Sequence, residues 1–294
     1  MSLNSVNTNM GAMVALESLD STNSELASVQ KQVSTGYKVA DATDNGASFA
    51  IAQRVRSDVA SLTTVNDQLG GVQGQVSTGL TGLTDASNQL NTMGQVLTQL
   101  ADGSITSTQR AQYQQQFKTD VAQLKNMFSN ATYNGRSLIG GVNGGTANSA
   151  TVVQNEVGGT YGVASFGALN TVLGGTTFTY ASASAFFTSV TNLETTNSTN
   201  AQAAMTATGV FSNLRTALGT ALNYYGSASN YINTTISYNS DKIDALNSGL
   251  GSLVDANLAQ ESAQLQSLQI KQQLGEQALS IANQAPQALL SLFK

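Results

Sequence analysis

The sequence contains no cysteine, no histidine and no tryptophan, and its one proline is Pro286. Without cysteine the chain forms no disulfide and has no thiolate nucleophile, and without histidine it also lacks the usual zinc ligands. A Ser-His-Asp catalytic triad is excluded for the same reason. Enzymes that use only carboxylates, lysine, tyrosine or serine stay formally open.

Charged residues are scarce as well. They make up 10% of the 294 residues, whereas typical soluble domains contain about 25%. Polar uncharged residues and glycine fill the difference, so copies of the chain repel one another weakly and self-association is favoured. The formal net charge is −5, and the 12 basic residues are scattered singly along the chain. This distribution offers no basic patch for nucleic acid.

Long apolar runs are also missing. No stretch approaches the roughly 20 residues that span a bilayer, so we expect no membrane insertion. The opening segment MSLNSVNTNMGAM has neither a basic region nor an unbroken apolar core and does not resemble a secretory signal peptide. We therefore expect the chain to stay in the cytoplasm or to leave the cell by a route that needs no cleaved signal.

Apolar side chains instead recur at helical spacing. In residues 3–33 they lie mostly three, four or seven positions apart, in a narrow stripe typical of a coiled-coil seam. Gly36 suits the end of this helix, and Asp41 or Asp44 suits the start of the next. The same spacing over residues 47–100 predicts a helix of about 50 residues, which suits a rod better than a globular domain.

Glycines interrupt this long predicted helix at Gly70, Gly71, Gly74, Gly79 and Gly82. Each lowers the intrinsic helix stability by up to about 1 kcal/mol relative to alanine. Packing must offset this loss, and the missing side chains allow a neighbouring helix to come close.

A further helix is predicted from Thr106 or Ser107 to about Phe128, followed by a turn at Asn134-Gly135. Residues 137–214 then differ in kind, because they contain only two charged residues and several glycine pairs. The segments TVVQNEVGGTYGVASF and TTFTY predict short strands joined by hairpin turns.

Helical spacing returns near Ala183 and continues through Ile236 with one break at most. A last helix, again with a narrow apolar stripe, is predicted from about Ser240 to Leu292. Pro286 falls inside it and is expected to bend or loosen it. The two terminal stripes bury each other most simply by pairing, and other copies of the molecule are expected to cover what one pair leaves exposed.

The predicted fold is therefore mainly α. Paired N- and C-terminal segments form a long helical rod or coiled coil, with a small β-hairpin insert in the middle.

Several segments resemble bacterial flagellins. The segments that carry the resemblance are SLNSVNTNMGAMVALESL, QVSTGYKVADATDNGASFAIAQRVRSD, ATYNGRSL and the C-terminal block LVDANLAQESAQLQSLQIKQQLGEQALSIANQAPQALLSLF. They cover about residues 2–138 and 212–294 in the family's order, and the C-terminal block is most similar to flagellins of alphaproteobacteria.

The resemblance implies a structural subunit that self-assembles into the helical filament of the bacterial flagellum for swimming motility. It implies no enzymatic activity and no cofactor. An inner core domain would combine residues 1–43 and 250–294, and a rod domain would combine residues 44–136 and 183–249. Residues 137–182 would form the variable hairpin or outer insert.

The resemblance also implies a place outside the cell, in the flagellar filament, reached by export through the flagellar type III apparatus with an export chaperone. The expected partners are further copies of the chain, other flagellins, and the filament cap and junction proteins. Two alternatives stay open: a hook–filament junction protein, which has similar ends, and a secreted adhesin or binding module.

The predicted subunit interface consists of apolar residues of the terminal helices: Leu3, Val6, Met10, Met13, Leu26, Val33, Leu258, Leu265, Leu268, Leu274, Ile281, Leu289 and Leu292. Candidate O-glycosylation sites in the Ser/Thr-rich middle are Thr176, Thr177, Ser182 and Ser184. Two S-x-x-K matches, Ser28-Lys31 and Ser291-Lys294, lack the partner motifs of a serine–lysine hydrolase, and we interpret them as chance. The acidic pairs Asp41/Asp44 and Asp241/Asp244 are interpreted as caps or solvated side chains rather than acid–base catalysts.

Overall fold

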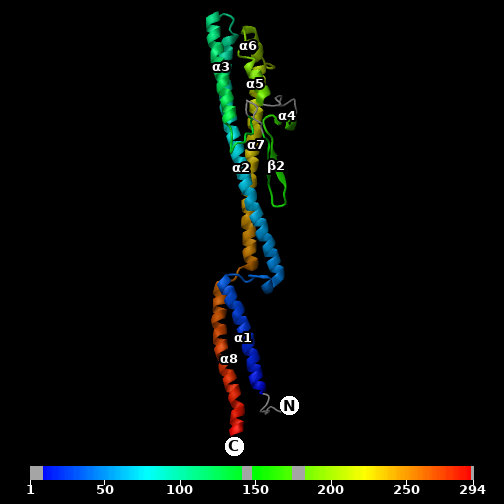
Figure 1. Ribbon diagram of the computed structural model, residues 1–294, viewed down its shortest axis with the longest axis vertical. Helices are drawn as coiled ribbons and strands as arrows, with labels where there is room; N and C mark the ends of the chain where they lie inside the picture. Colours follow the sequence, from blue (N-terminus) through cyan, green and yellow to red (C-terminus); the bar gives the residue numbers. More distant parts are fainter. Residues whose placement is uncertain (1–8, 141–147, 174–182, 293–294) are drawn as a thin grey trace. The chain divides into compact units, whose positions relative to one another are not determined.

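The computed structural model describes residues 9–140, 148–173 and 183–292, apart from the side chains of residues 170–171 and 285–292. The chain divides into two compact units (Figure 1). The terminal unit combines Met1–Val59 with Asp244–Lys294, and the central unit is Ala60–Ile243. The domain limits predicted from the sequence, at residues 43 and 249, stay predictions.

The terminal unit is built on two helices, α1 (Met10–Thr35) and α8 (Leu258–Leu292), which lie side by side (Figure 1). They run antiparallel, because Asn9 contacts Ala282 near one end while Tyr37 pairs with Asp255 near the other. The predicted pairing of the N- and C-terminal segments is therefore confirmed.

Local signals set both ends of α1, and the one at Gly36 was predicted. The Asn9 side chain caps its first turn by accepting a hydrogen bond from the Ala12 backbone N–H. Gly36 ends the helix with φ of 74°, a left-handed conformation that favours glycine. The next helix, α2 (Ala42–Ala101), opens with one turn capped by Asp41, which accepts from the Thr43 N–H.

The prediction of one last helix from Ser240 to Leu292 is wrong. Helix α7 (Val210–Val254) continues past this start, and α8 begins only at Leu258. The break persists because its backbone pairs with a distant segment: the N–H of Ala256 donates to Gly36 O, and the N–H of Lys38 donates to Val254 O. A helix through residues 255–257 would lose these hydrogen bonds.

In the central unit, α2 and α3 (Ser107–Asn130) form an antiparallel pair, and α7 packs along them. Thr106 caps α3 with a reciprocal capping box to Gln109, as its predicted role requires. Asn134 and Gly135 both have positive φ, which confirms the turn predicted there. Gly82 of α2 faces Ala131 so closely that an added Cβ would lie 2.7 Å from the Ala131 Cβ.

Strands β1 (Ala150–Val153) and β2 (Thr160–Val163) pair antiparallel, with Ala150 opposite Val163. They confirm the hairpin predicted in TVVQNEVGGTYGVASF, whereas TTFTY lies outside the described residues. The helical pattern expected from Ala183 is interrupted twice rather than once. It forms α5 (Ala183–Thr191), α6 (Ser198–Met205) and α7, and a short α4 (Leu169–Val172) precedes them.

The central core is aromatic. The Phe128 ring lies 5.7 Å from those of Phe166 and Phe186 and 4.9 Å from that of Phe187, centroid to centroid. Tyr225 is fully buried, and its hydroxyl donates to backbone oxygens of Leu138 and Ala164. Burial raises the pKa of this hydroxyl. The described residues thus confirm a mainly α fold with a small hairpin.

Candidate assembly surface

The facing residues of α1 and α8 form a regular seam. In α1 up to residue 30, and in α8 up to residue 284, the residues that are not exposed lie alternately three and four positions apart. This is the spacing of the core positions of a coiled coil. The seam residues are Ala12, Ala15, Leu19, Thr22, Leu26 and Val29 in α1 and Glu261, Leu265, Leu268, Gln272, Gly275, Leu279 and Ala282 in α8, and Val33 continues the spacing in α1.

This seam is shallow. Within it only Val29 and Leu268 are buried, at 4% and 2% exposure. Small and polar residues occupy several other positions. Gly275 faces Leu19, and Gln272 donates to the Asn23 side chain at 2.9 Å. The pair therefore removes little apolar area from water, and its stabilisation by the hydrophobic effect is correspondingly small.

A second apolar stripe lies on the faces turned away from the seam. Counted along the coiled-coil repeat, its residues occupy the outer positions, which are normally polar. Their side chains are 58% to 69% exposed. We call this set the outer stripe: Met10, Met13 and Val14 of α1, and Ile270, Leu274 and Ile281 of α8.

The structure divides the predicted interface residues between these two surfaces. Leu26, Val33, Leu265 and Leu268 belong to the seam, whereas Met10, Met13, Leu274 and Ile281 belong to the outer stripe. Leu258 is exposed at the start of α8. Leu3 and Val6 lie outside the described residues, as do the side chains of Leu289 and Leu292.

Sequence reasoning missed Val14 and Ile270, because it read each terminal helix as carrying a single stripe. Both can be recognised in the sequence as apolar residues that lie two positions along the chain from a seam residue. Ile270 lies two residues after Leu268, and Val14 two residues after Ala12.

The seam ends at a joint between two connectors, residues 36–41 and 255–257. Besides the backbone hydrogen bonds already described, the joint has a small apolar cluster of Val39, Ala52 and Val254, with Phe49, Leu250 and Leu253 packed against it. The two connectors are thus held together by backbone pairing and by burial within the terminal unit.

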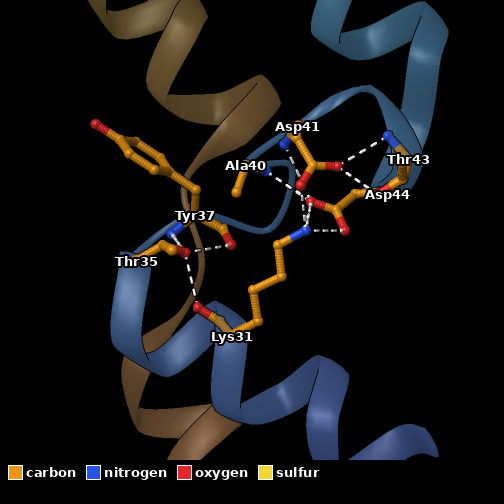
Figure 2. Close-up of polar contacts among 7 residues, drawn as sticks. All are labelled: Lys31, Thr35, Tyr37, Ala40, Asp41, Thr43 and Asp44. Carbon is orange, nitrogen blue, oxygen red and sulfur yellow. Dashed lines mark hydrogen bonds and ion pairs between the residues drawn. The ribbon is translucent and has the colours of Figure 1, made fainter.

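Lys31 provides an ionic contact at this joint (Figure 2). Its Nζ lies 2.7 Å from carboxylate oxygens of both Asp41 and Asp44. The hydrogen bonds from Lys31 lower the pKa of both carboxyls, that of Asp41 well below its usual range, and the same contacts raise the pKa of Lys31. Asp44 also accepts from the backbone N–H of Ala40. These acids act as caps and ion-pair partners, and the lysine of the first S-x-x-K match is engaged with them.

The other candidate sites are the predicted O-glycosylation residues and a cleft in the central unit. Ser184 is exposed on α5, while Thr176, Thr177 and Ser182 lie outside the described residues. A cleft of about 430 Å³ lies beside the hairpin turn, lined by residues of the turn and of α7, including Glu156, Tyr231, Tyr238 and Lys242. Glu156 and Lys242 form an ion pair in it.

Within the described part of the chain, acidic side chains nowhere gather in threes to hold a metal ion. None of the described helices has the length and apolar character of a membrane span.

The sequence of this chain matches those of known proteins. Residues 6–144 match the model of the bacterial flagellin N-terminal helical region, and residues 200–293 match that of the C-terminal helical region. The chain belongs to the bacterial flagellin family. This flagellin is 36% identical to flagellins FljM and FljK of Caulobacter vibrioides, with all of both chains covered in each comparison. It is 33% identical to a flagellin of Brucella melitensis, with 99% of each chain covered.

These similarities extend over the full length, including the middle. The flagellin is accordingly a structural subunit of the bacterial flagellar filament, as its resemblance to the family implied.

Proposed function

We propose that the outer stripe is the surface through which copies of this flagellin contact one another in the filament. The observation that carries the proposal is the exposure of its six apolar side chains on the helix faces opposite the seam. Burying one such side chain contributes roughly 1.5–3 kcal/mol. A neighbouring copy that covers the stripe therefore supplies the burial that the single helix pair lacks.

The shallow seam supports the same proposal. Ordering the backbone of each residue costs about 1–2 kcal/mol, and the seam of a single copy buries few side chains fully. The helix pair is therefore marginal in the monomer and becomes fully ordered when other copies cover its outer faces. Low charge helps, since only 10% of residues are charged and repulsion between copies is weak.

The route to the filament belongs to the same proposal. The chain is exported in an unfolded state through the flagellar type III apparatus, after binding an export chaperone, and meets cap and junction proteins at the filament. The absence of cysteine suits this route, because no disulfide has to be broken before the chain is threaded. We propose no catalytic activity.

Substitution of the outer stripe tests the proposal. Ile270→Gln and Leu274→Gln place polar side chains on two adjacent turns of α8 and leave the seam unchanged. Each is expected to raise the critical concentration for assembly at least about tenfold. Gln269→Asn, at an exposed polar position of the same helix, is the matched control and should assemble normally.

Assembly is measured by sedimentation and electron microscopy after adding filament seeds. Circular dichroism of the monomers checks that the central unit is folded in every variant. Normal filament assembly by both glutamine variants would rule out the outer stripe as the contact surface.

Electron microscopy also separates the two alternatives. A hook–filament junction protein is not expected to form long filaments by itself. An adhesin would owe its activity to a binding surface such as the cleft beside the hairpin turn, and not to assembly. Long uniform filaments from the purified protein favour the filament subunit over both.

A further inference from the structure

We propose that Met10 and Met13 are oxidation-sensitive sites, and that their conversion to methionine sulfoxide by a peroxide prevents the monomer from assembling. The proposal rests on the proposed role of the outer stripe as the contact surface. It adds a chemical modification by which that surface is switched off and restored.

The two methionines dominate the part of the outer stripe that lies on α1. Met10 is the first residue of the helix, and Met13 follows one turn later on the same face. Their side chains are 62% and 59% exposed, with Val14 beside them. Because methionine oxidation follows exposure, both sulfur atoms are open to a small oxidant in the monomer.

The other described methionines are better protected. Met93 is fully buried in the central core, and Met127 and Met205 are half-buried. The Met205 sulfur also accepts a hydrogen bond from the Thr98 hydroxyl at 3.6 Å. Peroxide should therefore modify Met10 and Met13 first and reach Met93 only when the central unit unfolds.

The reaction transfers one oxygen atom. The thioether sulfur attacks a peroxide oxygen, the O–O bond breaks, a sulfur–oxygen bond forms, and the other oxygen leaves as water when the oxidant is hydrogen peroxide. Sulfur is oxidised by two electrons and the peroxide is reduced by two. The product is polar and chiral, so it no longer suits a contact that excludes water.

The test treats the purified monomer with hydrogen peroxide, locates added oxygen by peptide mass mapping, and then measures assembly on seeds. Oxidation at Met10 and Met13 is expected to raise the critical concentration at least about tenfold. Repair by the two methionine sulfoxide reductases, one for each sulfoxide epimer, should restore it. In seeded filaments both residues should be oxidised at least about tenfold more slowly than in the monomer.

Matched variants test whether Met10 and Met13 are the residues whose oxidation prevents assembly. The double variant Met10→Leu/Met13→Leu keeps apolar side chains of similar volume and should assemble equally well before and after peroxide. Met205→Leu should stay as sensitive as the unsubstituted protein. Loss of assembly by the peroxide-treated double variant would show that oxidation acts at residues other than Met10 and Met13, and would overturn the inference. So would failure of repair to restore assembly of the unsubstituted protein, a measurement that needs no variant.

The outcomes separate this inference from the proposed function. If the oxidised monomer assembles normally while Leu274→Gln does not, the oxidation inference is wrong and the contact surface stands. If Met10 and Met13 are oxidised as fast in filaments as in the monomer, this part of the outer stripe is uncovered there. That result contradicts both proposals for α1.

Discussion

The two units of this flagellin use the same helical spacing in different ways. In the central unit, α2, α3 and α7 enclose a core of phenylalanine, leucine and a fully buried tyrosine. In the terminal unit, α1 and α8 meet along a seam with alanine, threonine, glutamine and glycine, and large apolar side chains lie on the opposite faces. The central unit buries most of its large apolar side chains within the chain, whereas the terminal unit leaves several of them exposed.

Under the proposed function, this difference lets a single chain combine a central unit that has its own core with ends that assemble. If the outer stripe were buried within one molecule, α1 and α8 would offer fewer apolar side chains to other copies. If the central core were equally shallow, the monomer would have no stable part to present its ends.

Hydrogen exchange should show the largest contrast between the units. In the free monomer, amides of α1 and α8 are expected to exchange at least about a thousandfold faster than those of α3. In the filament, amides of α1 and α8 should become protected while α3 changes little. Mass spectrometry of peptides from both forms measures this, and strong protection of α1 and α8 in the free monomer would contradict assembly-driven ordering.

Truncation of a core aromatic residue should produce the next largest effect. Phe128→Ala removes a ring that packs against three others and should lower the free energy of unfolding of the central unit by about 3–5 kcal/mol. Leu265→Ala, in the half-exposed seam, should cost the monomer less than about 2 kcal/mol. Urea unfolding below the critical concentration compares the two. Equal costs would show that the seam is as well packed as the core.

Substitution of two glycines of α2 should change the stability by smaller amounts and with opposite signs. Gly82→Ala should destabilise the protein by about 1–3 kcal/mol, because its new methyl group meets Ala131. A Cβ added at Gly70 would meet no neighbouring group within 4 Å, so Gly70→Ala should stabilise the helix by up to about 1 kcal/mol. Thermal unfolding of both variants checks the signs, and stabilisation by both would mean that α2 and Ala131 lie further apart.

Carboxyl pKa values should show the finest contrast. Lys31 lowers the pKa of Asp41 and Asp44, whereas burial raises that of Asp120, whose Oδ2 has no hydrogen-bond partner among the described residues. The lowered groups stabilise the fold above pH 3.8, and this stabilisation is lost as the pH falls through their folded pKa values. Ionised Asp120 destabilises the fold, so its effect becomes more favourable as the pH falls through its raised pKa.

Carbon-13 NMR titration of the side-chain carboxyls measures this directly. Asp41 and Asp44 should titrate below 3.8 and Asp120 above it. In Lys31→Met the first two should move back toward 3.8 while Asp120, the internal control, stays unchanged. Unaltered titration of Asp41 and Asp44 in this variant would show that Lys31 does not hold them.

The sequence was sufficient wherever a local rule decides the structure. Gly36 ends α1, Thr106 caps α3, and Asn134-Gly135 forms a turn, because each of these preferences depends on neighbouring residues alone. The long helices and their pairing followed from the spacing of apolar residues.

Long-range contacts explain what the sequence did not reveal. The break after Val254 depends on hydrogen bonds with a segment more than two hundred residues earlier. The spacing of apolar residues around Val254 does not predict it. The aromatic core also joins α3 to α5 through Phe128 and Phe186, which no local pattern links. The division of the terminal apolar residues into seam and outer stripe needed the register of α1 on α8.

The pairing of Tyr37 with Asp255 has a consequence for the order of folding. It closes a chain loop that contains the whole central unit, and loop-closure entropy makes such a contact unfavourable in an unfolded chain. Within the central unit, Asn239 donates to Asn66 and already brings the two sides of that loop together. The central unit should therefore fold first, and the ends should then meet across a much shorter effective loop.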